Sequence, residues 1–157
     1  MNIFVVDLDP VVAAQALCDK HVVKMTLETA QILAAVSARY GVAGPYKPTH
    51  AKHPCTLWAG DSHANWQWTV VHGLTLADEY TRRYGKRHAS HDVVKWYLVH
   101  GGAPRSGRAT PFAQAMPEQY RADDAVAAYR AYYRGEKSRI ATWREPAAPP
   151  SWFTSAA

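Results

Sequence analysis

The sequence predicts an all-α fold: one compact domain of about four helices, with a long first helix, a short N-terminal arm and an extended C-terminal tail. The chain has 157 residues, which is the length of one ordinary domain. Hydrophobic residues make up 48% of it and include six Trp and nine Tyr, enough for a substantial core. Apolar residues recur at three- and four-residue spacing over long segments, as they do in amphipathic helices.

The N-terminal arm, residues 1–9, holds the short apolar run of residues 2–6, which is either an extended strand or a buried arm. A helix begins after it. Asp9 can cap free backbone amides, and Pro10 at the first helical position sacrifices no hydrogen bond. Because residues 10–40 contain no glycine and no further proline, we expect one long helix there.

Two more helices are expected in the middle of the chain. Residues 41–54 are rich in glycine and proline and predict a loop. An aspartate and a serine at positions 61 and 62 can cap a helix over residues 62–84, which carries a stripe of apolar residues and stops at Gly85. A shorter helix is expected over residues 91–99, since two glycines follow it.

The C-terminal third is less regular. Residues 103–120 show no clear period and predict an ordered surface loop. Asp123 or Asp124 can cap a last helix that runs to about Trp143. The tail, residues 144–157, is rich in proline and is not expected to be helical, but its two aromatic residues suggest that it docks on the body. No internal repeat is present, so the whole chain is expected to form one domain.

The charge of the chain favours nucleic acid as a partner. The formal net charge is +5 and the isoelectric point about 9.3, so the protein attracts polyanions. Lysines and arginines gather in the loop before residue 54, at the end of the helix over residues 62–84 and on the last helix, with aromatic residues between them that can stack on bases. The residues expected to contact nucleic acid are His21, Lys24, Gln31, Lys47, His50, Lys52, His53, Arg82, Arg83, Lys86, Arg134 and Lys137.

A polar stripe runs along the first predicted helix. His21, Lys24, Glu28 and Gln31 follow one another at steps of three, four and three, so they share one face, and the other faces are apolar. We expect the stripe to open into a cleft or into solvent. A lysine one turn before a carboxylate, with an imidazole nearby, can serve acid–base chemistry. The alternative is a solvated face with a simple Lys24–Glu28 ion pair.

A metal site is the weaker alternative. His50 and His53, with Cys55 close behind, are residue types that bind zinc, but no Cys-x-x-Cys pair supplies further ligands. We therefore expect no metal and no other cofactor. Two cysteines are too few for a disulfide scaffold, no apolar run is long enough for a membrane span, and no positively charged leader is present. These features predict a cytoplasmic protein with no membrane partner. They do not determine the oligomeric state, for which a monomer is favoured.

One segment resembles a known family. Residues 17–21, Leu-Cys-Asp-Lys-His, followed by Glu28, resemble the first helix of the phage pyrimidine-dimer DNA glycosylases of the endonuclease V type. That family has a Leu-x-Asp-x-His segment with its catalytic glutamate seven residues after the histidine. Residues 83–85 and 132–137 give looser similarity. The resemblance implies a short, basic, mostly helical enzyme that acts on double-stranded DNA.

The resemblance also implies a mechanism. The family uses its N-terminal α-amine to attack the sugar, expel the base and form an imine, and its glutamate assists the proton transfers. Glu28 takes the glutamate's place. The family exposes a threonine amine, whereas this chain begins Met1-Asn2, so the nucleophile is expected at Met1, or at Asn2 if the methionine is removed. Leu27 and Gln31 stand where the family has arginines.

Three functions remain open from the sequence. The first is a DNA glycosylase, with AP-lyase activity as a further step, that acts on a damaged or modified pyrimidine. The second is a non-catalytic DNA-binding protein of the same fold. The third is a metal-dependent nuclease or hydrolase that uses His50 and His53.

Overall fold

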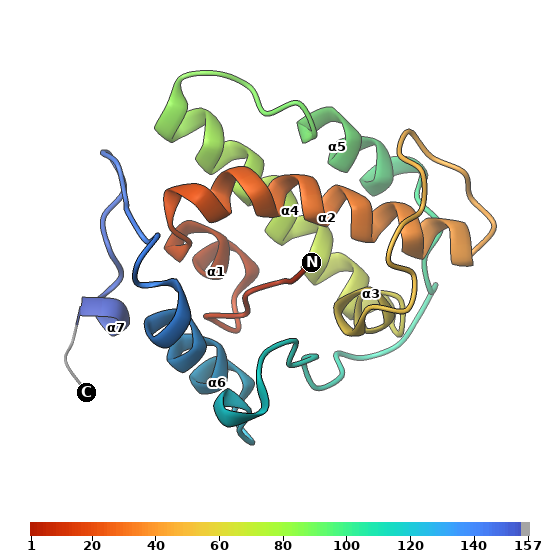
Figure 1. Ribbon diagram of the computed structural model, residues 1–157. Helices are drawn as coiled ribbons and strands as arrows, with labels where there is room; N and C mark the ends of the chain where they lie inside the picture. The colour runs from red at the N-terminus through yellow and green to blue at the C-terminus, as the bar shows by residue number, and fades with distance from the viewer. Residues whose placement is uncertain (155–157) are drawn as a thin grey trace.

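The computed structural model describes residues 1–154, and within them the chain is helical, with no strand. Figure 1 shows α2 and α4 crossing at the centre, with the shorter helices arranged around them. The helices are α1 (Pro10–Ala16), α2 (Asp19–Arg39), α3 (Pro54–Ala59), α4 (His63–Tyr84), α5 (His91–His100), α6 (Ala125–Tyr132) and α7 (Ser151–Thr154), with a 3-10 turn η1 (Glu118–Tyr120) and a π-helical turn η2 (Tyr133–Lys137). None of these helices is long and apolar enough to cross a membrane.

The expected single helix over residues 10–40 is wrong, because the chain breaks between α1 and α2. Leu17 and Cys18 are extended, with ψ angles of 145° and 163°, and both side chains are fully buried. Tertiary contacts stabilise the break. The Leu17 carbonyl accepts a hydrogen bond from Arg83 at 2.8 Å, and the Cys18 N–H donates to the hydroxyl of Tyr133 at 2.9 Å. These partners replace the helical hydrogen bonds that the local sequence favours.

The helices predicted over residues 62–84 and 91–99 are observed as α4 and α5. The hydroxyl of Ser62 caps α4, and Gly85 ends it in the left-handed conformation at φ 67°. The short helix α3 lies just after the expected loop and was not predicted. It begins at Pro54, and the ring of His53 accepts a hydrogen bond from the backbone N–H two residues on.

The last helix is shorter than expected. It was predicted to reach residue 143, but α6 ends at Tyr132 and widens into η2. Within η2, Tyr133 is fully buried, and a Cβ at Gly135 would collide with the hydroxyl of Tyr120. The π-helical turn has wider i→i+5 hydrogen bonds than an α-helix, and in this geometry Tyr133 is buried while Gly135 lies against Tyr120.

The tail was predicted to be non-helical, and this is wrong for its end, since α7 forms one short helix. Two prolines precede α7, where they fit the first turn of a helix. Trp152 and Phe153 lie edge-on to the ring of Tyr133, at centroid distances of 5.8 and 6.3 Å. Arg134 donates to the Trp152 carbonyl at 2.9 Å. The predicted tail residues 155–157 lie outside the described residues.

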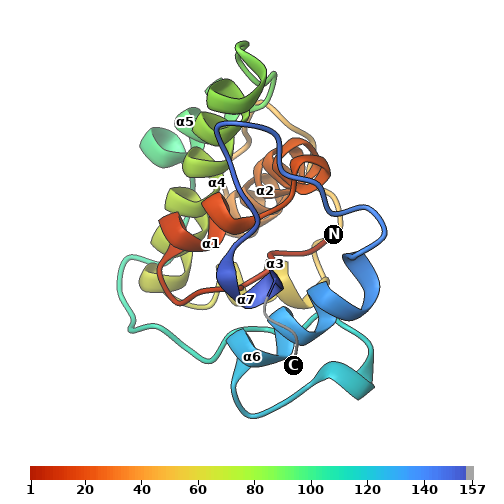
Figure 2. The same ribbon diagram turned by 90° about the vertical axis from the view of Figure 1, so that its left-hand side faces the viewer.

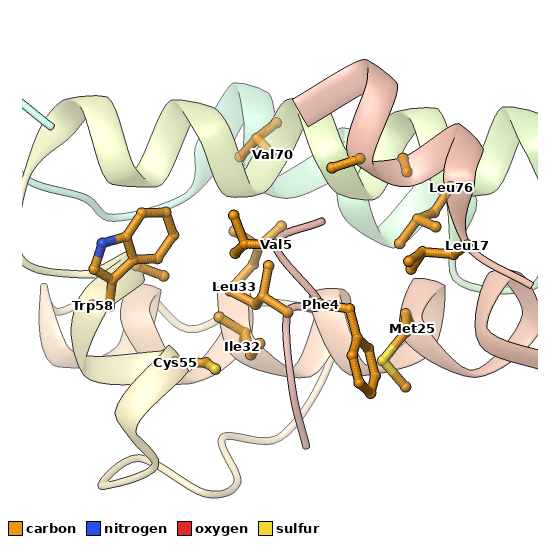
Figure 3. Packing of buried hydrophobic residues seen from close by; sticks show 14 of the residues in the cluster. Phe4, Val5, Leu17, Met25, Ile32, Leu33, Cys55, Trp58, Val70 and Leu76 are labelled. Carbon is orange, nitrogen blue, oxygen red and sulfur yellow. The ribbon is translucent and has the colours of Figure 1, made fainter. Parts of the chain in front are cut away.

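The N-terminal arm is the feature that positions the site. Its apolar residues Ile3, Phe4, Val5 and Val6 are all at most 4% exposed. Figure 3 shows Phe4 and Val5 packed among side chains of α2, α3 and α4. The run of residues 2–6 is thus a buried arm rather than a strand. It brings the chain's first residue between α2, α3 and α6, on the side of the molecule that faces the viewer in Figure 1 (Figures 1 and 2).

Candidate active site

The side chain of Glu28, on α2, lies against the start of the chain and is 10% exposed. Its Oε2 accepts a hydrogen bond from the backbone N–H of Asn2 at 3.0 Å. Its Oε1 lies 3.8 Å from the amine of Met1 and 3.5 Å from Nζ of Lys24, one turn earlier on the same helix. One carboxylate oxygen thus faces two cationic nitrogens. The 3.8 Å between Oε1 and the amine is an ion-pair distance, from which a small movement brings the two groups close enough for proton transfer.

Helix α3 holds the first residues in place. The side chain of Met1 is 2% exposed, and its sulfur accepts a weak hydrogen bond from the hydroxyl of Thr56 at 3.5 Å. Asn2 is 8% exposed and is touched by the thiol of Cys55 at 3.7 Å. The arm therefore ends in a fixed position beside Glu28 rather than in solvent.

His21 lies two turns before Glu28 on α2 and is also buried. Its ring stacks on Phe4 at a centroid distance of 4.4 Å, and its Nδ1 lies 2.8 Å from the hydroxyl of Tyr133. That hydroxyl already accepts the Cys18 N–H, so its own proton points to Nδ1. The proton of the neutral imidazole then resides on Nε2.

The four residues of the polar stripe predicted on the first helix differ in their exposure to solvent. Burial lowers the pKa of His21 to about 4, and the charges of Lys137 and Lys24 act in the same direction. His21 and Glu28 are buried, Gln31 is half-buried, and the side chain of Lys24 is 66% exposed. The stripe therefore combines a neutral imidazole, a sheltered carboxylate and an ammonium group open to solvent.

His53 lies close enough to the N-terminal amine and Glu28 for both charges to affect its pKa. Its pKa is lowered, first by burial and then by the positive N-terminal amine and His50, while Glu28 acts in the opposite direction. Its Nδ1 accepts the N–H of Cys55 at 3.2 Å, which leaves Nε2 as the ring's donor. His53 is thus a half-buried, neutral hydrogen-bond donor beside the start of the chain.

The remaining residues of the histidine loop face solvent. His50 is exposed, adopts a positive φ of 51°, and pairs its Nδ1 with the hydroxyl of Thr49 at 2.7 Å. Lys47 and Lys52 are exposed on the same loop. Within residues 1–154, no three His, Cys, Asp or Glu side chains gather closely enough to hold a metal ion, so His50 and His53 lack the further ligands that a metal hydrolase needs.

The two basic residues of η2 that were expected to bind nucleic acid contact different parts of the molecule. Nζ of Lys137 lies 4.7 Å from the ring centroid of Tyr132 and 6.0 Å from that of Phe4, which places this cation at the end of α2 that carries His21. Arg134 is half-buried and holds the tail through the Trp152 carbonyl. Lys137 is therefore the better placed of the two to meet a ligand.

The cluster at the end of α4 is split between surface and interior. Arg82 and Lys86 are exposed. The side chain of Arg83 is fully buried and pairs with Glu79 at 2.8 Å and with Asp19 at 3.2 Å. Arg83 also donates to the backbone carbonyls of Leu17 and Gln15, so it connects α4 to the junction of α1 and α2. The structure therefore gives Arg83 a role in the fold.

A groove of about 660 Å³ lies elsewhere on the molecule. Its walls include Tyr40, His63, Trp66, Leu98 and Arg105. None of the residues that surround Glu28 lines it. This groove is therefore separate from the candidate active site at the start of the chain.

Comparison with known proteins assigns the chain to a family. A family profile described as pyrimidine dimer DNA glycosylase matches residues 1–92, which is more than half of the chain. The chain belongs to the pyrimidine dimer DNA glycosylase family. The resemblance seen in residues 17–21 and Glu28 is confirmed at this level, and both lie within the matched part. No curated protein and no solved structure matches the chain.

Membership of the pyrimidine dimer DNA glycosylase family implies DNA glycosylase activity, a role in DNA repair and DNA as the substrate. The match covers the arm and α1 to α4, and thus Met1, Lys24, Glu28 and His53. Lys137 and the rest of the C-terminal part lie beyond it.

Two residues of the site have roles that the sequence did not predict: Thr56 was not singled out, and Tyr129, expected among the aromatic residues that can stack on bases, is fully buried. Thr56 and Tyr129 touch Met1 and Asn2, over separations of 55 and 127 residues. No local pattern marks either residue, because one belongs to an unpredicted short helix and the other to an ordinary aromatic position on α6. A contact between such distant segments depends on the tertiary fold alone.

Proposed function

We propose that this protein removes a damaged or modified pyrimidine from double-stranded DNA and then cleaves the strand as an AP lyase, with its N-terminal amine as nucleophile and Glu28 as the group that moves protons. The observation that carries this proposal is the position of Glu28, whose Oε1 lies 3.8 Å from the amine of Met1 and whose Oε2 accepts the N–H of Asn2. Family membership supplies the class of reaction.

The chemistry suits an amine in this position. An α-amine loses its proton more readily than a lysine side chain, so more of it is a free nucleophile at neutral pH. Its lone pair forms a bond to C1′ of the sugar, and the electron pair of the glycosidic bond leaves with the base, which takes up a proton. Loss of the remaining amine proton and opening of the sugar ring give an imine.

Glu28 serves both halves of the reaction. It first accepts a proton from the attacking amine and then returns it as the ring oxygen leaves C1′. In the lyase step Glu28, again a carboxylate, accepts the proton from C2′. The electron pair of that C–H bond forms the C2′–C3′ double bond, and the 3′ phosphate leaves with its bonding electrons, which cleaves the strand. The carboxylate is only 10% exposed, which favours these transfers because competing water is largely excluded.

Contact with DNA is provided by the cations around the site. The target base must leave the stack so that the amine of Met1, which lies beside the buried Glu28, can reach C1′ of its sugar. Lys24 is exposed next to Glu28, Lys137 lies beside Phe4, and Lys47 and Lys52 extend from the histidine loop. We assign to these residues contacts with phosphates, and to His53 a hydrogen bond from Nε2 to a phosphate or base oxygen.

Borohydride trapping on DNA with an abasic site tests the proposal. Borohydride reduces an imine to a stable amine, so the wild-type protein is expected to become covalently attached to the strand. Glu28→Gln should slow the trapping by about 100-fold or more, because the proton carrier is lost. Glu118→Gln, at an exposed glutamate of η1, is the matched control and should trap at the wild-type rate. Salt-dependent DNA binding without any adduct would instead identify a non-catalytic DNA-binding protein.

A further inference from the structure

The hydroxyl of Tyr129, on α6, reaches the second residue of the chain. Tyr129 has no solvent exposure. Its hydroxyl lies 3.0 Å from Oδ1 of Asn2 and 2.8 Å from the carbonyl of Ala113, and it accepts the N–H of Ala115 at 3.2 Å. Its one proton is therefore shared between two acceptors. Three segments, namely the arm, the loop before η1 and α6, meet at this hydroxyl.

The Asn2 side chain completes the arrangement. Its Nδ2 donates to the carbonyl of Ala115 at 2.7 Å, while its Oδ1 also accepts the N–H of Ile3 at 2.8 Å. An amide side chain can donate from its nitrogen and accept at its oxygen at the same time. We call Asn2, Tyr129, Ala113 and Ala115 the Asn2 clamp.

The Asn2 clamp acts on the same residue whose backbone N–H meets Glu28. The side chain of Asn2 is fixed on one side by Tyr129 and Ala115, and its backbone nitrogen lies 3.0 Å from the Glu28 carboxylate on the other. The amine of Met1 is one residue away. The orientation of this amine toward Glu28 therefore depends on the clamp.

We infer that Tyr129 is a positioning residue, whose hydroxyl holds Asn2 so that the N-terminal amine stays in attacking position beside Glu28. This inference rests on the proposed function for the role of the amine. Small losses of alignment are costly in such reactions, since a misplacement of about 1 Å can lower a rate by about 100-fold. The clamp also gives the C-terminal part of the chain, which the family profile does not cover, a role in the reaction.

The hydrogen-bond roles in the clamp do not change over the working pH range. Burial is the main cause that raises the pKa of Tyr129, and the neighbouring Cys55 adds to it. Burial likewise raises the pKa of the Cys55 thiol to about 11. Both groups keep their protons at neutral pH, so both act as neutral donors toward Asn2.

The test compares Tyr129→Phe with Tyr97→Phe. Tyr97 is equally buried and bonds only weakly to the backbone of Tyr46, at 3.4 and 3.5 Å, so it controls for the loss of a buried hydroxyl. Under single-turnover conditions, Tyr129→Phe should lower the rate of borohydride trapping by about 10- to 100-fold, with the affinity for DNA within about threefold of wild type. Tyr97→Phe should change neither value. A rate equal to wild type in Tyr129→Phe overturns the inference.

A second measurement does not depend on activity. Hydrogen exchange of the peptide that contains residues 2–6 should become faster in Tyr129→Phe, while exchange in α4 stays unchanged. Unchanged exchange in the arm overturns the inference, even if the wild-type protein forms no adduct. Faster exchange of the arm in Tyr129→Phe, with no adduct formed by the wild-type protein, would support the Asn2 clamp and reject the proposed function.

A third variant covers the case in which Tyr129→Phe does not fold. Asn2→Leu removes the other half of the same contact, keeps a side chain of similar size after Met1, and should give the same losses in trapping rate and in protection of the arm. Where both single variants fold, the double variant should be no slower than the slower single one, because both changes break one interaction. Independent, multiplying effects in the double variant would overturn the inference.

Discussion

The backbone N–H of Asn2 donates a hydrogen bond to Oε2 of Glu28 at 3.0 Å, across 26 positions of sequence. The other oxygen of the same carboxylate lies 3.8 Å from the amine of Met1. The nitrogens of the first two residues therefore both face Glu28. If Met1 is removed, the new amine is the nitrogen that already bonds to Glu28, so the proposed chemistry is compatible with either form of the chain.

Blocking the start of the chain should abolish the reaction. Addition of two residues before Met1 moves the free amine away from Glu28 and converts the nitrogen of Met1 into an amide. We expect the trapping rate to fall by at least about 100-fold, because an amide is not a nucleophile. The affinity for DNA should stay within about threefold. The same extension at the C-terminus is the control, and intact mass establishes which residue begins each protein.

Neighbouring arginines should have unequal effects on stability. Arg83→Met leaves the buried Glu79 without its partner in the interior, and we expect a loss of about 3–5 kcal/mol in the free energy of unfolding. Arg82, whose side chain is 43% exposed, also bonds to Glu79. Arg82→Met should cost about 1 kcal/mol or less, since exposed pairs contribute little. Urea denaturation measures both, and equal losses would contradict the assignment of Arg83 to the fold.

His72 should make the protein sensitive to acid. It is fully buried, stacks on Trp68 at 4.9 Å, and neither ring nitrogen has a hydrogen-bond partner among the described residues. Burial lowers its pKa from 6.5 to about 3. Between these values the unfolded chain binds a proton that the folded protein does not, so the free energy of unfolding falls as the pH falls from about 6.5 toward 3.

The variant His72→Phe should weaken this dependence. It keeps an aromatic ring on Trp68 and removes the titrating group. Relative to wild type, the slope of the free energy of unfolding against pH should decrease by up to about 1.4 kcal/mol per pH unit at pH 4–6. His21, whose pKa is lowered to about 4, accounts for part of the slope that remains. Urea titrations at pH 5 and 7 give the slope, and an unchanged value would show that His72 is accessible to protons in the folded protein.

Lys24 should contribute to DNA binding through its charge. Its side chain is 66% exposed and lies beside Glu28. Lys24→Gln should reduce the slope of log affinity against log salt concentration by about 0.9, the value for one lost phosphate contact. Lys95→Gln, at an exposed lysine of α5, should leave the slope unchanged. A similar slope for wild type and Lys24→Gln would place this residue outside the DNA contact.

Local signals predicted part of this fold well. The helix over residues 62–84 was predicted because Ser62 caps it, Gly85 stops it and an apolar stripe runs between them. The spacing of His21 and Glu28 within a recognisable segment led to the family, which the profile match confirms. Each of these features lies within a few turns of one helix, where sequence pattern and structure are directly connected.

The remaining features depend on contacts between distant segments. Leu17 and Cys18 have no glycine or proline beside them, and their break is stabilised by Arg83 and Tyr133. The arm covers the polar stripe of α2, so that Glu28 is buried although its helical position alone predicts a residue open to a cleft or solvent. Propensity and spacing carry no information about such long-range partners.

Mapping the trapped adduct tests the central proposal most directly. After borohydride reduction on DNA with an abasic site, digestion with trypsin and mass spectrometry locate the modified residue. We predict that the sugar remnant is attached to the α-amine of the first residue, on the peptide that ends at Lys20. An adduct on the side chain of Lys24 or Lys137, or no adduct with an unblocked chain, would contradict the account.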